Sequence, residues 1–171
     1  RASTDWTVNC ADGVDSAALA ALPNVDLMSF HLYPDGWGKD AAWGTAWIRT
    51  HVQLANRIHK PVMLGEFGYQ DKATRNPVYK AWTDEAVRDG IDGFLYWLIA
   101  DHTYPDYDGF TVYAGTPVFT TISNFAQMMA TNERLRFPPV ADNDTAVVDF
   151  NTGTTLSPLA NRAVPPVGRT C

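Results

Sequence analysis

Three short, nearly continuous apolar segments predict strands that are buried on both faces. They cover residues 25–33, 61–68 and 93–99. Apolar residues at consecutive positions, rather than alternating ones, are typical of a parallel strand that is covered on both sides. The segments start roughly 33 residues apart, which is a common length for one strand-helix unit. We therefore expect three parallel strands joined by helices.

Amphipathic stretches around these segments predict four helices. Two of the helices are expected to begin where a capping residue precedes a proline, at Asn76-Pro77 and Thr116-Pro117. Gly90 is expected to end the first of these two. The four expected helices cover residues 15–22, 43–59, 77–89 and 117–129. Helical spacing in the second places four residues on one face of the helix: Trp47, Leu54, Ala55 and Ile58.

This alternation of helices and strands predicts an α/β fold with a parallel sheet and right-handed crossovers. Three strands are few for such a sheet, and they leave an edge without a partner. We expect the missing strands to precede Arg1, and the chain to be a mature or excised piece of a longer protein, because it starts with neither Met nor a signal peptide.

Composition and charge exclude several classes of partner. The chain has 171 residues, 46% of them hydrophobic and 19% charged, as is typical of a globular protein. The net charge is −6, and Lys and Arg form no cluster, so the chain lacks the positive surface that nucleic-acid binding needs. No apolar run approaches the roughly 18 residues of a membrane span.

The C-terminal part of the chain differs in character. Residues 136–139 suggest a linker, and residues 140–171 are rich in strand and turn formers. Part of that segment resembles the opening of a bacterial immunoglobulin-like repeat, and a plain C-terminal extension packed against the rest of the chain is the alternative. Cys10 and Cys171 lack the spacing of a zinc site, and they are either free thiols or part of disulfides in an exported protein.

One carboxylate stands at the end of an apolar strand and is the main candidate for chemistry. Glu66 ends the second segment, where a charge costs several kcal/mol unless it is hydrogen-bonded or functional. The carboxyl ends of barrel strands carry active sites. His31 and Tyr33 share one face of the first strand at a matching depth, and Trp97 reaches that depth on the third. The alternatives are a solvated glutamate and ordinary core residues.

Four motifs in the same order resemble one enzyme family. They are His31-Leu32-Tyr33-Pro34, Leu64-Gly65-Glu66-Phe67-Gly68, Leu95-Tyr96-Trp97 and residues 104–110. Together they look like glycoside hydrolase family 5, and more narrowly like its endo-β-1,4-mannanases of the plant, fungal and actinobacterial type. Trp37-Gly38 and the helix from Trp43 fit the same group. The resemblance covers roughly residues 5 to 130.

The resemblance implies a (β/α)₈ TIM barrel in which the three segments are strands six, seven and eight. Residues 1–135 would then be the C-terminal half of the catalytic domain, followed by the extension at 136–171. Carried over from the family, Glu66 is the nucleophile and Tyr33 orients it. His31 and Trp37 contact the substrate, and Trp97 forms the aromatic platform under a sugar ring. The resemblance also implies a secreted enzyme that uses no metal or organic cofactor.

The family pattern is only half present. A retaining glycosidase needs a second carboxyl group, the general acid, at about 5–5.5 Å from the nucleophile. In the family this group is the Glu of an Asn-Glu pair on strand four, and the only such pair here is Asn132-Glu133, after the last helix. The strand-three Arg of the family is missing as well. Four loop carboxylates are poor substitutes, because they are mobile and solvated: Asp35, Asp101, Asp106 and Asp108.

We therefore expect that this chain alone does not hydrolyse mannan and that an N-terminal half barrel completes the enzyme. Two alternatives remain. The chain could belong to a β-1,4-glucanase of the same family, since both activities use the same nucleophile, His and Tyr. It could also be a non-catalytic half barrel that binds mannan through His31, Tyr33 and Trp97.

Overall fold

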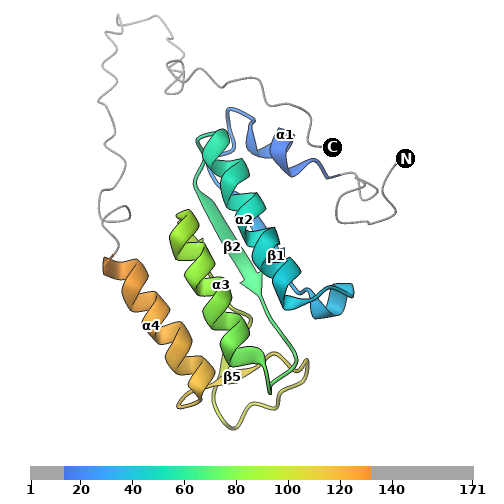
Figure 1. Cartoon of the computed structure of the whole chain (residues 1–171), viewed down its shortest axis with the longest axis vertical. Coiled ribbons are helices and arrows are strands. Elements are labelled where there is room, and N and C mark those ends of the chain that lie inside the picture. The colour runs from blue at the N-terminus through green and yellow to red at the C-terminus, as the bar shows by residue number, and fades with distance from the viewer. Residues whose placement is uncertain (1–13, 132–171) are drawn as a thin grey trace, which may run out of the picture.

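The computed structural model describes residues 14–131, which form helices and strands in alternation (Figure 1). The expected extension at 136–171, Cys10 and Cys171 lie outside the described residues. No helix within residues 14–131 is both long and apolar enough to cross a membrane. The elements are α1 Ser16–Ala20, β1 Met28–Leu32, η1 Asp35–Trp37, α2 Ala41–Arg57, β2 Val62–Phe67, α3 Arg75–Asp89, β3 Gly93–Phe94, β4 Ile99–Ala100, β5 Val112–Tyr113 and α4 Pro117–Thr131.

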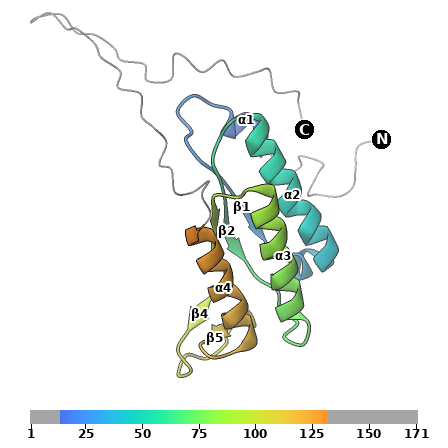
Figure 2. The same cartoon turned by 60° about the vertical axis from the view of Figure 1, so that its left-hand side comes forward.

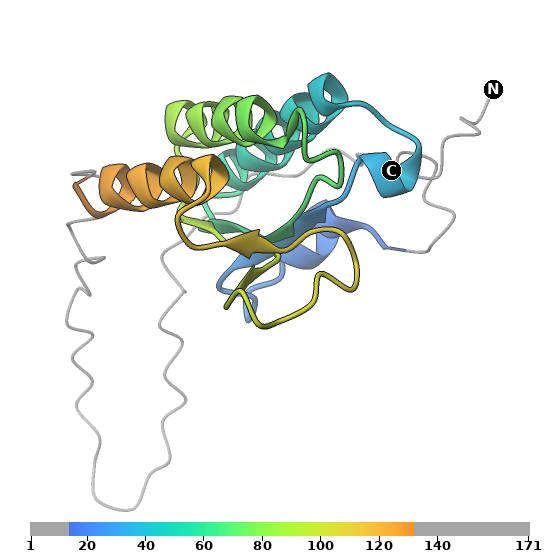
Figure 3. The ribbon, with the colours of Figure 1, turned by 90° about the horizontal axis from the view of Figure 1, so that it is seen from below.

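The three expected strands form one parallel sheet in the order β1-β2-β3. Helices α2, α3 and α4 lie side by side over one face of this sheet, as Figures 1, 2 and 3 all show. The predicted α/β fold with parallel strands is therefore confirmed. Within residues 14–131, β1 and β3 each pair with β2 alone.

The third strand is shorter than expected. The prediction covered residues 93–99, but β3 ends at Phe94. The next residues still follow β2, because Leu95 N donates to Leu64 O at 2.9 Å and Trp97 N donates to Phe67 O at 2.8 Å. The chain then leaves the sheet, and Ile99–Ala100 pairs with β5 instead. An apolar run alone does not reveal this change of partner.

Two of the helix-start predictions had different outcomes. Thr116 does cap α4, since its Oγ1 accepts a hydrogen bond from Phe119 N at 3.3 Å. Asn76 does not cap α3, which begins one residue before it. Its Oδ1 instead accepts a hydrogen bond from Thr121 Oγ1 at 2.7 Å and joins α3 to α4. Gly90 ends α3 as expected, with φ at 83°.

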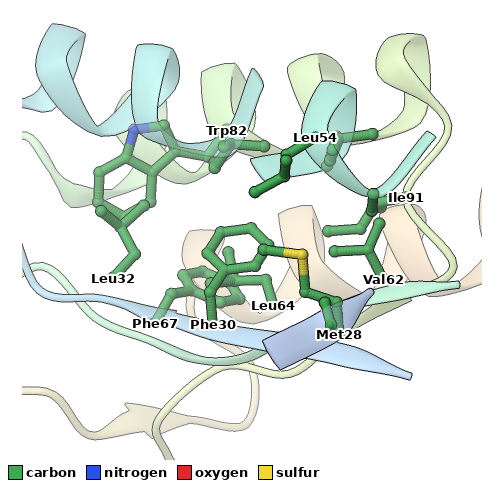
Figure 4. Packing of buried hydrophobic residues seen from close by; sticks show 14 of the residues in the cluster. Met28, Phe30, Leu32, Leu54, Val62, Leu64, Phe67, Trp82 and Ile91 are labelled. Carbon is green, nitrogen blue, oxygen red and sulfur yellow. The ribbon is translucent and has the colours of Figure 1, made fainter. Parts of the chain in front are cut away.

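The core lies between the sheet and the helices (Figure 4). Trp82 of α3 belongs to this core and is fully buried. Its Nε1 donates to Ala41 O at 3.0 Å, so the polar end of the ring has a partner. A side-chain carbon added at Gly44 would be 2.8 Å from the Trp82 ring, so this glycine allows α2 to lie close to α3. The strands contribute Met28, Phe30, Leu32, Val62, Leu64 and Phe67 to this core.

A buried histidine predicts acid sensitivity of the fold. His51 of α2 stacks on Phe30, with ring centroids 4.4 Å apart, and packs at a tilt against Trp47, with ring centroids 4.1 Å apart. Burial lowers the pKa of His51, and its hydrogen bond to the Trp47 carbonyl offsets this only in part. The unfolded chain therefore binds a proton more readily than the folded one just below about pH 6.5. We expect the free energy of unfolding to fall as the pH drops through this value toward the lowered pKa.

Urea unfolding of the chain between pH 5 and 7.5 measures this effect. The variant His51→Gln should be less stable at neutral pH but should lose part of the pH dependence. A suitable control is His59→Asn, because His59 is exposed with φ at 56°, a conformation that asparagine tolerates. If His51→Gln kept the full pH dependence of the wild type, His51 would not be its source.

Candidate active site

The open face of the sheet brings together three of the predicted site residues. Tyr33 Oη donates a hydrogen bond to Glu66 Oε2 at 2.8 Å. His31 Nδ1 lies 3.6 Å from the same oxygen. The side chains of His31 and Glu66 are 50% and 37% exposed, so the carboxylate is accessible while it is held in place. The expected proximity of these residues is present, whereas their catalytic roles stay predictions.

A bulge in β2 turns Glu66 toward this face. Phe30 pairs with Leu64, but the next residue of β1, His31, pairs with Glu66, so Gly65 is the extra residue. In a regular strand Glu66 would share the face of Leu64 and point at the helices. The bulge shifts the alternation by one residue, as such features do. A side-chain carbon at Gly65 would lie 2.6 Å from Ser29 Oγ, so a larger residue there would force Ser29 or the strand to move.

Tyr33 is fixed by ring packing and stays protonated. Its ring packs edge-on against Phe110, with centroids 5.1 Å apart. Both rings lie directly over Gly68, where an added side-chain carbon would be 2.9 Å from Tyr33 and 2.5 Å from Phe110. Burial raises the pKa of Tyr33 far above its usual value, and the hydrogen bond to Glu66 and the charge of Glu66 raise it further. The phenol therefore remains a hydrogen-bond donor to the carboxylate.

A cleft of about 330 Å³ opens beside Tyr33. Trp97 lines it with 41% of its surface exposed, and Trp97 Nε1 donates to Asp108 Oδ2 at 2.7 Å. The lining combines aromatic rings with a few polar groups, which is the composition expected for a site that orients a small polar ligand. Its lining residues are Tyr33, Gly36, Trp37, Gln70, Trp97, Asp108 and Phe110.

Trp37 belongs to an aromatic cluster that sequence reasoning saw only in part. The Trp37 ring is 6.4 Å from Tyr33, 6.0 Å from Trp43 and 6.1 Å from Trp47. Trp47 was expected on one face of its helix with Leu54, Ala55 and Ile58; it is half-buried and packs against the core, and its Nε1 donates to His31 O at 3.1 Å. Helical spacing identified the apolar side of α2 but did not show that its N-terminal end reaches the site.

The four loop carboxylates hold the loops in place. Asp35 accepts a hydrogen bond from Gln70 N at 2.6 Å, and Asp101 accepts one from Thr103 N at 2.9 Å. Asp106 pairs with Lys72. Burial tends to raise the pKa of Asp106, but hydrogen bonds from Lys72 and Thr111 outweigh it and lower the pKa to about 2. A general acid needs a raised pKa, so Asp106 is unsuited to that role.

Sequence reasoning missed the side chains that join these loops. Gln70 and Arg75 connect their own part of the chain to residues 101–111. They donate to the main-chain carbonyl groups of Asp108, Phe110 and Thr111. Hydrophobic periodicity carries no signal for such contacts. Within residues 14–131, no three His, Cys, Asp or Glu side chains are grouped as metal ligands would be.

Comparison with known proteins relates the chain to mannan-degrading enzymes. No family model matches it. It is 32% identical to mannan endo-1,4-beta-mannosidase A of Podospora anserina over 125 residues, which are 70% of this chain and 33% of that protein. The chain thus spans about a third of the length of this relative.

Two solved structures are similar in both fold and sequence. The endo-1,4-beta-D-mannanase of Thermotoga petrophila has a TM-score of 0.68 and 36% identity, over 72% of this chain and 39% of that one. The endo-1,4-beta-mannanase of Rhizomucor miehei has a TM-score of 0.70 and 31% identity, over 76% of this chain and 37% of that one.

Proposed function

The chain belongs to the mannan endo-1,4-β-mannosidases of glycoside hydrolase family 5, and we propose that it supplies the nucleophile half of a retaining endo-mannanase. In this proposal β1, β2 and β3 are strands six, seven and eight of a (β/α)₈ barrel. The whole enzyme cleaves internal β-1,4 bonds in mannan, galactomannan or glucomannan. The observation that carries the proposal is the hydrogen bond from Tyr33 to Glu66 beside an aromatic cleft.

In the proposed mechanism Glu66 reacts with the sugar, and Tyr33 and Trp97 position the reacting groups. One carboxylate oxygen of Glu66 attacks the anomeric carbon of the sugar, and the bond from that carbon to the glycosidic oxygen breaks. The departing oxygen takes a proton from a general acid on the other half of the barrel. Water then displaces Glu66, activated by the same acid in its basic form. The hydrogen bond from Tyr33 orients the Glu66 carboxylate, and Trp97 stacks on the sugar.

The open edge of the sheet supports a second half that supplies the general acid. Leu95, which follows β3, and Ile99 of β4 are each 53% exposed. A cavity of about 480 Å³ lies between this edge and α4, and its lining includes Phe94, Ile122 and Phe125. Such apolar surface is typical of an interface that is covered in the complete protein. The proposed cover is an N-terminal half barrel that carries the Asn-Glu pair.

Reducing-sugar release from galactomannan tests the proposal. The purified 171-residue chain should be inactive. We use the term assembled enzyme for this chain together with a companion polypeptide that carries Asn-Glu. The assembled enzyme should be active. Turnover by the chain alone would contradict the half-site assignment. Assays on mannan and carboxymethylcellulose separate the two substrate classes, and a preference for carboxymethylcellulose would favour the glucanase alternative. Mannan binding by an assembly without turnover would favour the non-catalytic alternative.

Removal of the Tyr33 hydroxyl should slow the assembled enzyme without unfolding it. In Tyr33→Phe the ring keeps its packing, but Glu66 loses a donor at 2.8 Å. We expect kcat on galactomannan to fall about tenfold or more, since a hydrogen bond to a charged group contributes about 1.5–3 kcal/mol. Steady-state kinetics and the unfolding temperature measure the two effects. Tyr113→Phe is the matched control, because Tyr113 donates only to Tyr104 O away from Glu66. If kcat were unchanged in Tyr33→Phe, the Tyr33 hydroxyl would not orient Glu66 for the reaction.

The whole protein is also proposed to be secreted, because a polymer such as mannan is cut outside the cell. Detection of the protein in the culture medium of its source would support this. Retention of all of the protein inside cells that grow on mannan would contradict it.

A further inference from the structure

The ring of Trp97 depends on one polar contact for its orientation. At 41% exposure the indole is less confined by packing than a core tryptophan. Its Nε1 donates to Asp108 Oδ2 at 2.7 Å, a charge-assisted bond to one edge of the ring. A bond at the edge of a planar ring restricts its rotation about both side-chain torsions. Asp108 is therefore placed where it can fix the direction in which the flat face of Trp97 points.

Asp108 is itself held at two further points. Its other carboxylate oxygen, Oδ1, accepts a hydrogen bond from Phe110 N at 3.0 Å. Its main-chain carbonyl oxygen accepts one from Gln70 Nε2 at 2.8 Å. The two carboxylate oxygens thus have different partners, one in the loop and one on the indole. The side chain of Asp108 thus links the main chain of its own loop to the indole of Trp97.

A buried arginine anchors this loop to the start of α3. Arg75 is 3% exposed, and its guanidinium donates to main-chain carbonyl groups on both sides. It bonds the loop after β2 at Gln70 O, 3.1 Å away, and the later loop at Thr111 O, 3.2 Å away. It also donates to the carbonyl groups of Tyr69, Gly109 and Phe110. Several charge-assisted bonds from one planar group fix both loops in one relative position.

We propose that Asp108 is a positioning residue that fixes the indole of Trp97 as a sugar platform beside Glu66, with Arg75 as the anchor of the loop that carries it. The inference rests on the proposed function, since it concerns the ring on which the sugar stacks. It assigns to a loop carboxylate a role in substrate binding rather than in proton transfer. The role requires only that the Oδ2 atom accept the indole hydrogen.

The indole N–H of Trp97 can be observed without any sugar. In the ¹⁵N-labelled 171-residue chain, we expect Asp108→Ala to shift the Trp97 Nε1–H signal and to speed its exchange with water by about tenfold or more, because the charged acceptor is gone. Asp108→Asn should restore part of the protection, since an amide oxygen still accepts. Asp101→Asn is the matched control in the same loop, because Asp101 caps Thr103 N and should leave the signal unchanged. An unchanged signal in Asp108→Ala would overturn the proposal.

Kinetics of the assembled enzyme on mannopentaose test the link to substrate. We expect Asp108→Ala to raise KM about tenfold and to change kcat by less than about threefold, because a platform binds the sugar similarly before and during the reaction. In a Trp97→Phe background, which lacks the N–H, Asp108→Ala should have almost no further effect. An equal effect of Asp108→Ala in both backgrounds would overturn the proposal, since Asp108 would then act by another route.

The two experiments separate this inference from the proposed function. Absence of turnover in the wild-type assembled enzyme would contradict the proposed function. The indole measurement, which needs no sugar, would still decide whether Asp108 fixes the Trp97 ring.

Discussion

We expect Glu66→Gln to lower kcat of the assembled enzyme on galactomannan by about 10⁴-fold or more, the size of loss seen when a catalytic nucleophile is removed. Glutamine has nearly the shape of glutamate, and its oxygen can still accept the hydrogen bond that Tyr33 donates to Oε2. It cannot form the glycosyl-enzyme bond, because an amide is a far weaker nucleophile than a carboxylate. Initial rates on galactomannan, with enzyme concentrations raised to detect the residual activity, measure this effect.

Binding and stability should change little in the same variant. The Glu66 side chain is 37% exposed, so its charge contributes little to the core. We expect mannopentaose affinity to stay within about threefold of the wild type, a change of well under 1 kcal/mol. Asp84→Asn is the matched control, because it removes an exposed carboxylate that pairs with Lys80 on α3. If Glu66→Gln turned over substrate at the wild-type rate, Glu66 would not be the nucleophile.

Trp82→Ala should produce the largest loss of stability in the described part of the chain. Trp82 is fully buried, packs against Phe67 and Tyr79 at 6.1 and 5.9 Å, and donates to Ala41 O. Truncation of a buried tryptophan costs about 3–5 kcal/mol through lost contacts and the cavity left behind. Since whole domains are stable by only about 5–15 kcal/mol, we expect a large drop in the urea midpoint.

Two further variants separate packing from the hydrogen bond. Trp82→Phe fills much of the space but leaves the Ala41 carbonyl without this donor, so it should cost about 1–3 kcal/mol. Trp97→Ala removes a ring that is 41% exposed, and its cost should be clearly smaller than that of Trp82→Ala. Equal losses for Trp82→Ala and Trp97→Ala would contradict the placement of the core.

Periodicity predicted where the helices and the first two strands lie, but it did not show where the third strand changes its partner. Helix α2 matches its amphipathic pattern, and α3 ends at Gly90 because a positive φ suits glycine. The third strand was predicted too long, because apolar residues continue past Phe94 although the chain changes its pairing partner at β4. Apolar character does not say with which segment a residue pairs, nor that it is buried, since Leu95 and Ile99 of this run are each 53% exposed.

The candidate site was predictable as a set of residue types but not as a geometry. The motifs named His31, Tyr33, Glu66 and Trp97, yet strict alternation in β2 would have turned Glu66 toward the helices. The bulge at Gly65 decides its direction, and a lone glycine within a strand was the available signal. The roles of Arg75 and Gln70 left no sequence signal, because their partners are mostly main-chain carbonyl groups.

Mass spectrometry of a trapped intermediate tests the central claim most directly. A mannosyl substrate with fluorine at C2 and a good leaving group slows breakdown of the glycosyl-enzyme, because fluorine disfavours the oxocarbenium-like transition state. After digestion of the assembled enzyme, the sugar mass should be found on the peptide that contains Glu66, and Glu66→Gln should carry none. A label on any other carboxylate, or turnover of the substrate by Glu66→Gln, would contradict the account.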